Sequence, residues 1–297
     1  MSSWEDNHRR LLNHGAEQVR AMFLPKALVN MLSGAICLDL DARGPNMVVS
    51  TACASGATAI GLALSWLRER RCDVVLAGGA EAGTTPLFIA GFHKLRALST
   101  HHEPRKASRP FDSDHDGFVM AEGSAVLVLE REEDARARGA RVWARVAGFG
   151  SAADAHHITA PHPAARGARA ALHAALSDAG LTPADIQHVN AHATGTPIGD
   201  SVEATLLREE LPQAAVTSTK GVTGHTLGAA GAIEAAYTAL ALHHRTVPPT
   251  ANHDQPCLAA DGLDIVSGAP RNVPGLHAAV STSFGFGGHN AVLVLTA

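Results

Sequence analysis

Four segments of this 297-residue chain combine reactive side chains with small-residue or glycine-rich turns. They span residues 51–56, 190–200, 217–231 and 283–290. The first three contain Cys53, His192, Lys220 and His225, and glycines in the fourth allow close backbone approach. A thiol and imidazoles are groups that covalent acyl transfer uses. Each segment alone could be a tight turn, but four at the strand ends of one sheet system indicate a reactive site.

Cys53 lies where an expected strand gives way to a helix of small residues over 54–67. The positive end of the helix dipole is expected to lower the pKa of this thiol and favour the thiolate. The alternative is a structural cysteine at a tight strand–helix crossing, which is the more common situation for a single cysteine.

Apolar strands alternate with alanine-rich helices, which favours a layered α/β fold. Strands are expected at 48–49, 74–77, 125–129, 142–147, 186–191, 216–219, 278–282 and 291–295. Helices are expected at 54–67, 130–138 and 164–179, from Asp200, and after Gly228. The helix from Asp200 is predicted from Asp200-Ser-Val-Glu203, which resembles a capping box.

The pentapeptide Ala-Val-Leu-Val-Leu occurs twice, at 125–129 and at 291–295. The first copy is expected to be a strand buried on both faces, because it is wholly apolar. Small-residue helices near Gly56 and Gly231 lie at a comparable offset. Short apolar strands coincide easily, but the matched context favours two similar halves.

The composition excludes several classes of protein. The chain is 46% apolar with a net charge of −4, so nothing favours nucleic acid or a membrane surface as a partner. No apolar run approaches the roughly 18 residues of a membrane span. The 4 cysteines have no CxxC spacing, which is typical of a reducing, cytoplasmic compartment.

Other motifs predict ordinary structure. Residues 112–117 begin like a calcium loop, but the twelfth position is Gly123 where a chelating Glu is needed, so a turn is expected. Residues 148–153 match G-x-G-x-x-A without the acidic residue about 20 positions later, where His173 stands. The 18 histidines form no HExxH motif and no zinc-finger spacing, so no metal site is expected.

Together the four segments resemble the β-ketoacyl-acyl-carrier-protein synthases, which are condensing enzymes of fatty-acid and polyketide assembly in the thiolase-like superfamily. The resemblance covers essentially the whole chain and is strongest to the elongating, synthase II type. Chain-initiating synthases would carry Asn at His225, and thiolases a second Cys in the loop that reads 287–289 here. Chain-length-factor subunits lack the nucleophile that matches Cys53. The resemblance implies a thiolase-like layered αβαβα fold of two similar halves, the first incomplete.

The resemblance also implies roles for five side chains. Cys53 would accept the acyl group, and His192 and His225 would stabilise the enolate formed as malonyl thioester loses carbon dioxide. Lys220, with Glu234, would set the electrostatics of the site. No cofactor is implied, because the substrates are carried on the phosphopantetheine of acyl carrier protein. A covalent acyl intermediate predicts ping-pong kinetics.

Further residues match the family by position. The backbone N–H of Phe286, with that of the nucleophile, would form the oxyanion hole, and the Phe286 side chain would be a gate. Thr194 and Thr196 would contact pantetheine, and Phe92 and Phe284 would contact the acyl substrate.

A basic patch for the acidic carrier protein is implied at Lys94, Arg96 and Arg20. Glu17 and Gln18 stand where basic residues are expected in that patch, which puts carrier affinity in question. A homodimer or a ketosynthase heterodimer is also implied.

Residues 1–141 match the later part of the N-terminal ketosynthase half, and 142–297 match the C-terminal half. Family members begin upstream of Met1, so part of the acyl-pocket wall and of the dimer surface would lie outside this chain. A misassigned start, a fragment and a partner that supplies the rest all fit this departure. The rival to a synthase is therefore an inactive subunit that binds acyl carrier protein or pairs with a complete synthase.

Overall fold

The computed structural model describes residues 2–297. The α-helices are α1 (Ser2–His14), α2 (Phe23–Ala27), α3 (Met31–Leu40), α4 (Ser55–Arg68), α5 (Pro86–Lys94), α6 (Glu132–Ala137), α7 (Arg166–Ala179), α8 (Pro197–Glu210), α9 (Lys220–Thr223) and α10 (Ala230–His244). The strands are β1 (Val74–Glu81), β2 (Gly123–Glu130), β3 (Arg145–Ala153), β4 (His188–Asn190), β5 (Ala215–Thr217), β6 (Thr246–Val247), β7 (Arg271–Asn272), β8 (Ala278–Gly285) and β9 (His289–Thr296). Within this described part, no helix is both long and apolar enough to span a bilayer.

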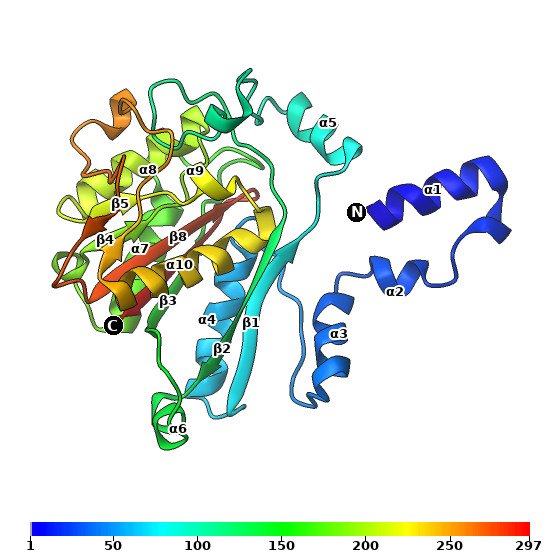
Figure 1. Cartoon of the computed structure of the whole chain (residues 1–297), viewed down its shortest axis with the longest axis horizontal. Helices are drawn as coiled ribbons and strands as arrows, with labels where there is room; N and C mark the ends of the chain where they lie inside the picture. The colour runs from blue at the N-terminus through cyan, green and yellow to red at the C-terminus, as the bar shows by residue number, and fades with distance from the viewer. Residues whose placement is uncertain (1) are drawn as a thin grey trace.

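The larger sheet has five strands in the order β3-β9-β8-β4-β5. β4 is parallel to both β5 and β8, whereas β9 is antiparallel to β3 and β8. One apolar core lies between this sheet and helices α7 and α8, and a second lies on the side of α4 and α10. The sheet is therefore covered by helices on both faces (Figure 1).

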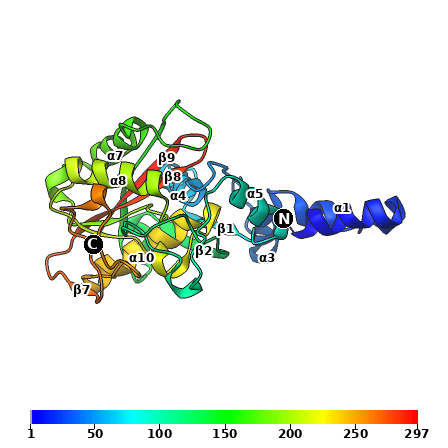
Figure 2. The same ribbon diagram turned by 90° about the horizontal axis from the view of Figure 1, so that it is seen from above.

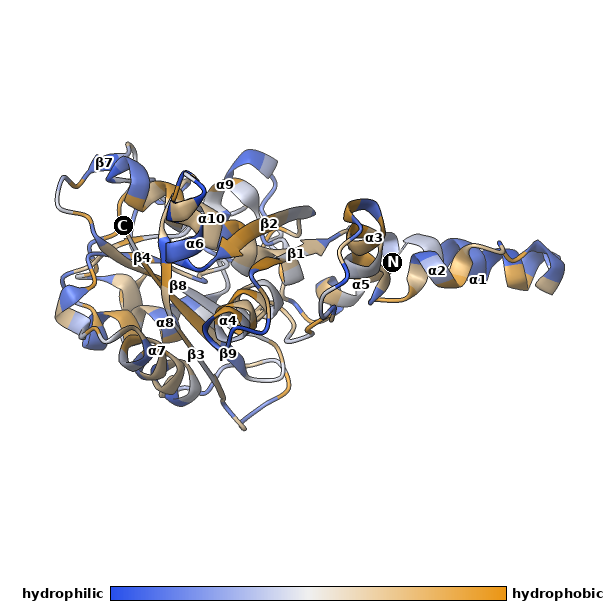
Figure 3. Cartoon of the chain, turned by 90° about the horizontal axis from the view of Figure 1, so that it is seen from below, coloured by the Kyte–Doolittle hydropathy of each residue, from blue (hydrophilic) through white to orange (hydrophobic). Residues whose placement is uncertain are grey.

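The smaller sheet is an antiparallel ribbon of β1 and β2. Its inner face packs on α4 and α10, so these two helices lie between the two sheets. Burial alternates along β2, and Val126 and Val128 are 51% and 60% exposed. The prediction that 125–129 is buried on both faces was wrong, because helices cover only one face of this ribbon. Figure 3 shows the apolar colouring of β2.

Helices α4 and α10 meet through a reciprocal glycine contact. A Cβ on Gly56 would lie 2.6 Å from the backbone N of Ala232, and a Cβ on Gly231 would lie 2.7 Å from the backbone N of Ala57. The absence of a side chain at both places lets the first turns of the two helices touch. The two small-residue segments noted in the sequence are thus partners in space.

Three local predictions need correction. No strand forms at 48–49. The strand expected at 142–147 instead runs through β3 and includes the glycines of 148–153, which therefore do not form a phosphate-binding turn. The helix expected from Asp200 already begins at Pro197, because proline is favoured in the first turn of a helix. Asp200 and Glu203 consequently lie inside α8.

Helices α1, α2 and α3 form an N-terminal arm that extends away from the two sheets (Figure 2). The arm exposes several apolar side chains, among them Leu12 and Leu38 at 69% and 81%. A hydrogen bond from the Thr85 hydroxyl to the Glu5 carboxylate ties α1 to the start of α5.

Candidate active site

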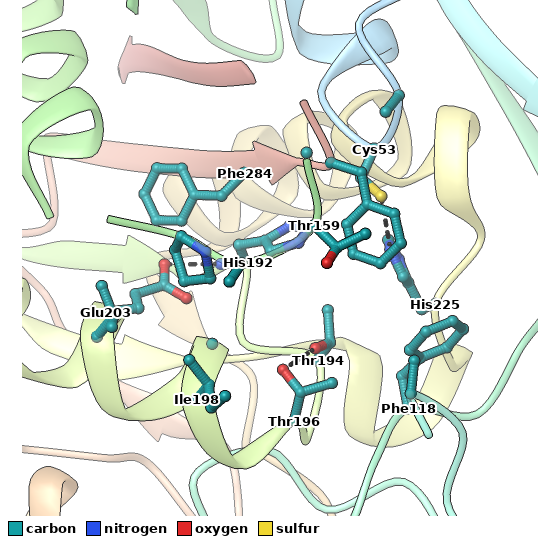
Figure 4. A pocket seen from close by; sticks show the side chains of 18 of the residues that line it. Cys53, Phe118, Thr159, His192, Thr194, Thr196, Ile198, Glu203, His225 and Phe284 are labelled. Atoms are coloured by element: carbon teal, nitrogen blue, oxygen red, sulfur yellow. Dashed lines mark hydrogen bonds between the residues drawn. The ribbon is translucent and has the colours of Figure 1, made fainter. Parts of the chain in front are cut away.

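A cavity of about 480 Å³ is lined by residues from 50–118 and from 154–290. Cys53, before α4, lies on one side, and His192, after β4, lies on the other. His225, between α9 and α10, lies beside the sulfur, and Phe286, after β8, closes the same wall. Figure 4 shows the cysteine and both imidazoles facing one space. Three of the four sequence segments therefore place reactive side chains here, and the fourth supplies a backbone wall.

The cysteine sits on a tight turn that a neighbouring strand approaches closely. Ala52 has a φ of +50°, in the left-handed region that non-glycine residues rarely occupy. A Cβ on Gly285 would lie only 2.7 Å from the carbonyl oxygen of Thr51. Glycine there lets the end of β8 reach the turn, so the N–H groups of Phe286 and Cys53 both act on the sulfur.

The resting Cys53 thiol is protonated at neutral pH. Burial raises its pKa to about 11, although the Lys220 ammonium and the Phe286 and Cys53 amides act in the opposite direction. The expectation that the helix N-terminus would lower this pKa was wrong, because desolvation outweighs the nearby positive charge.

The two imidazoles lie together and are neutral. The Nε2 atom of His225 is 3.1 Å from the Cys53 sulfur, and the His192 and His225 rings meet edge to face with centroids 5.3 Å apart. Burial lowers both imidazole pKa values well below 6.5, and the charge of Lys220 lowers them further. Neutral rings can act as bases or as hydrogen-bond donors.

A buried ion pair between Lys220 and Glu234 lies behind the imidazoles rather than on the cavity wall. Their side chains are 1% and 3% exposed. Burial raises the pKa of Glu234 to about 7, although Lys220 opposes this shift. Because the ammonium also lowers the pKa of both histidines, its effect on the site is electrostatic.

Hydroxyl groups and aromatic rings line opposite parts of the cavity. The hydroxyl oxygens of Thr194 and Thr196 are 3.1 Å apart. The Phe92 ring lies 6.3 Å from that of Phe286, and the Phe284 ring lies 5.9 Å from that of His192. Hydroxyl groups and aromatic rings therefore line the same cavity as the sulfur.

The residues expected to dock a carrier protein are only partly brought together. Arg96 lines the mouth of the cavity, and Lys94 shares a shallow surface depression with it. Arg20 lies on the N-terminal arm, where its guanidinium is 3.3 Å from the Asp6 carboxylate. The structure thus places Lys94 and Arg96 in one surface depression next to the cavity, and Arg20 elsewhere.

Four further residues of the site were not predicted. Phe118 packs edge to face on His225, with centroids 5.3 Å apart, and Thr159 lines the cavity. Asp200 accepts hydrogen bonds from the backbone N–H groups of Thr194 and Gly195, and Glu203 binds the segment that begins at His192. Phe118 was missed because it follows the Asp-rich segment 112–117, which the sequence predicts to be a turn. Asp200 and Glu203 were missed because their spacing resembles a capping box at the start of a helix. No sequence signal pointed to Thr159.

Among residues 2–297, no group of three or more His, Cys, Asp or Glu side chains is placed to hold a metal ion. Asp112, which is buried, accepts hydrogen bonds from the N–H groups of Asp114, Asp254 and Gln255, so the calcium-like segment is a hydrogen-bonded turn.

The layered arrangement is that of the thiolase-like ketosynthases. A type II polyketide ketosynthase solved in complex with its acyl-carrier protein superimposes with a TM-score of 0.96 at 30% identity, over 100% of this chain and 75% of that one. The ishigamide ketosynthase/chain length factor superimposes with a TM-score of 0.92 at 32% sequence identity, and the match covers 99% of this chain and 72% of that one. A beta-ketoacyl synthase from Burkholderia phymatum superimposes with a TM-score of 0.92 at 35% sequence identity, and the match covers 98% of this chain and 71% of that one.

The chain belongs to the beta-ketoacyl synthase family. The family model of the N-terminal domain matches residues 1–135, and that of the C-terminal domain matches residues 143–254. The chain is 44% identical over 296 residues to 3-oxoacyl-[acyl-carrier-protein] synthase 2 of Vibrio cholerae, covering 98% of the chain and 71% of that protein. It is 43% identical to the protein of the same name from Staphylococcus aureus, and the match covers 99% of the chain and 72% of that protein.

Proposed function

We propose that this protein is an elongating β-ketoacyl-acyl-carrier-protein synthase that extends an acyl chain by two carbons in fatty-acid or polyketide biosynthesis. The observation that carries the proposal is the cluster of one thiol, two neutral imidazoles and two backbone N–H donors around one cavity. Relatives at 43–44% identity that are named 3-oxoacyl-[acyl-carrier-protein] synthase 2 support it.

The first step transfers the acyl group to Cys53. Because the thiol is protonated and His225 is neutral, proton transfer to Nε2 accompanies attack of the sulfur on the thioester carbonyl. The N–H groups of Cys53 and Phe286 receive the negative oxygen. The carrier's pantetheine thiolate leaves, takes the proton back from His225, and the acyl group remains on sulfur.

The second step uses a malonyl thioester. After its ring proton exchanges from Nδ1 to Nε2, His225 donates a hydrogen bond to the carbonyl oxygen of this thioester together with His192. The electrons of the breaking carbon–carbon bond are then accepted as an enolate while carbon dioxide leaves. The enolate carbon attacks the acyl carbonyl on Cys53. The carbon–sulfur bond then breaks, the Cys53 thiolate takes a proton from solvent water, and the β-ketoacyl product stays on the carrier. Phe118, Phe284 and Phe286 keep this region apolar.

The carrier and partner expectations form part of the proposal. Lys94 and Arg96 would receive the acidic carrier protein beside the cavity mouth, and Thr194 and Thr196 would hold its pantetheine arm. Solved relatives include ketosynthases in complex with an acyl-carrier protein or a chain length factor, which supports a carrier and a ketosynthase-like subunit as partners. The four cysteines are free, in keeping with a cytoplasmic location. The division of the chain into two ketosynthase halves, at 1–141 and 142–297, also remains a prediction.

Matched variants test the proposed function. Cys53→Ala should abolish acyl loading, measured by intact mass, but should leave malonyl decarboxylation, because both imidazole donors remain. His192→Ala should impair decarboxylation while loading on Cys53 persists, and His225→Ala should impair decarboxylation. Acyl label on a cysteine other than Cys53 would contradict the assignment.

A non-catalytic subunit is the second candidate, because the outer face of the β1–β2 ribbon exposes apolar side chains as a partner surface would. Size-exclusion chromatography and malonyl decarboxylation by the chain as given separate the two functions. A chain that forms complexes with a synthase but neither loads acyl groups nor decarboxylates malonyl thioester is the subunit.

A further inference from the structure

Two histidines shape the β3–α7 loop, which lies beside the cavity. The Nδ1 atom of His157 accepts the backbone N–H groups of Thr159 and Ala160, each at 3.1 Å. The Nδ1 atom of His162 accepts the N–H of Ala164, also at 3.1 Å. Two imidazoles therefore act as hydrogen-bond acceptors for three backbone amides of one loop. The proposed chemical steps use neither of these histidines.

Only a neutral imidazole with its proton on Nε2 can accept these hydrogen bonds. In the charged ring both nitrogens carry a proton, so each Nδ1 would turn an N–H toward a backbone N–H. Protonation of the two side chains would therefore break three contacts at once. Histidine is the side chain whose charge ordinarily changes between about pH 5 and 8, so mild acid is enough to cause this change.

Charged and titratable groups surround the two rings. The centroid of the His156 ring lies 5.0 Å from that of His162. The loop has one acidic residue, Asp154, whose carboxylate accepts the backbone N–H of His162 at 3.0 Å. Arg166 is exposed at the start of α7, and His289 begins β9 opposite the end of β3. Protonation thus adds positive charge to a loop that has two further imidazoles and a guanidinium close by in the fold or the sequence.

The loop forms part of the active-site wall. Thr159 (Figure 4) and Ala160 line the cavity. The carbonyl oxygen of Ile158 accepts the N–H of Gly287 at 2.8 Å. Gly287 directly follows Phe286, whose N–H is a proposed oxyanion donor. Loss of the hydrogen bonds of Thr159 and Ala160 would therefore loosen both this wall and the segment that carries the donor.

We propose that His157 and His162 form an acid-sensitive clasp. The neutral imidazoles hold the β3–α7 loop against the cavity, and their protonation releases it. Release of the loop does not depend on the reaction, whereas its effect on acyl transfer rests on the proposed function. Acyl loading should therefore slow in acid for a reason additional to any direct effect of pH on the reacting groups.

The main test is the double variant His157→Asn/His162→Asn. The Oδ1 atom of Asn takes the place of the imidazole Nδ1, accepts a backbone N–H and does not titrate. Amide hydrogen exchange of peptides from the loop is measured at about pH 8 and about pH 5, and corrected for the intrinsic effect of pH. Protection should fall about tenfold in the unsubstituted chain, and less than about threefold in the double variant.

The second measurement is acyl loading of Cys53, followed by intact mass over the same pH range. The loading rate of the unsubstituted chain should fall about threefold further than that of the double variant. Both proteins keep Cys53 and His225, so direct effects of pH on these groups cancel in the comparison.

His173→Asn is the matched control, because it makes the same substitution outside the loop. His173 lies on α7 and its Nε2 atom is 2.7 Å from the Glu210 carboxylate. This variant should show the same loss of loop protection in acid as the unsubstituted chain, and the same pH profile of loading.

The outcomes distinguish the clasp from the proposed function. Loop protection that falls equally in the unsubstituted chain and the double variant, or in neither, would overturn the clasp. Protection that falls as expected while the two loading profiles coincide would overturn its role in acyl transfer. A chain that loads no acyl group on Cys53 at any pH would overturn the proposed function, whereas a loss of protection confined to the titratable loop would still establish the clasp.

Discussion

The same five residues, Ala-Val-Leu-Val-Leu, form the middle of β2 and of β9, but the two copies have different surroundings. In β9, every residue of the copy is at most 1% exposed, because β3 and β8 flank it and helices cover both faces. Among residues 2–297, β2 pairs with β1 alone and is covered on one face, so its two valines remain about half exposed. The pentapeptide specifies a strand in both places, and the surrounding layers determine its burial.

This difference extends to the site. His192, Lys220 and His225 belong to the part of the chain that contains the five-stranded sheet, whereas Cys53 precedes α4, next to the two-stranded ribbon. Both meet where α4 and α10 touch. We therefore expect equivalent substitutions in the β2 and β9 pentapeptides to have unequal effects on stability. Substitutions on either side of the contact between α4 and α10 should have equal effects.

The largest difference is expected at the central leucine of each copy. Leu293 is fully buried, so Leu293→Ala should lower the free energy of unfolding by about 2–5 kcal/mol. Leu127, the equivalent residue, is only partly buried, and Leu127→Ala should cost less than half as much. Urea denaturation of both variants measures this. Equal losses would show that the two strands are equally buried in solution.

Acid should weaken the five-stranded sheet through His188 in β4, because this side chain is fully buried. Burial lowers its pKa from 6.5 to about 4, so the unfolded chain binds the proton more readily than the folded one. Stability should therefore fall as pH drops from 6.5 to 4, by about 3 kcal/mol from this group. His188→Asn can still donate to the Ala215 carbonyl and should lack this part of the acid loss. The same pH dependence in both proteins would refute the prediction.

The reactive motifs were predictable because chemistry restricts their residue types and because glycines mark where backbones approach. The alternation of strands and helices likewise gave the layered fold. Burial of β2, the thiol pKa of Cys53 and the roles of Asp200 and Glu203 were not predictable. Each depends on which segments, distant in sequence, pack around the residue. A carboxylate inside a helix looks the same in the sequence whether it caps that helix or binds another strand.

The helix contact should respond in the same way from either side. Gly56→Ala and Gly231→Ala each place a methyl group within 2.7 Å of a backbone nitrogen, which should cost about 1–3 kcal/mol through overpacking. Both should also slow acyl loading, because Gly56 is in the first turn after Cys53. Thermal unfolding and intact mass measure the two effects. Gly91→Ala in α5 is the control, because its Cβ would meet no atom within 4 Å.

The smallest effect is expected on the outer face of the ribbon, and it tests what this face does. Val128→Thr replaces a methyl group by a hydroxyl that water can reach, so stability should change by less than about 0.5 kcal/mol. Val294→Thr, at the equivalent place in β9, buries the hydroxyl and should cost about 1–3 kcal/mol. If Val128→Thr destabilises the protein as much as Val294→Thr, and the loss depends on protein concentration, the ribbon face is buried by association in solution. If the loss is independent of concentration, the exposure of β2 described above is wrong, whereas a negligible loss leaves the face free for a partner.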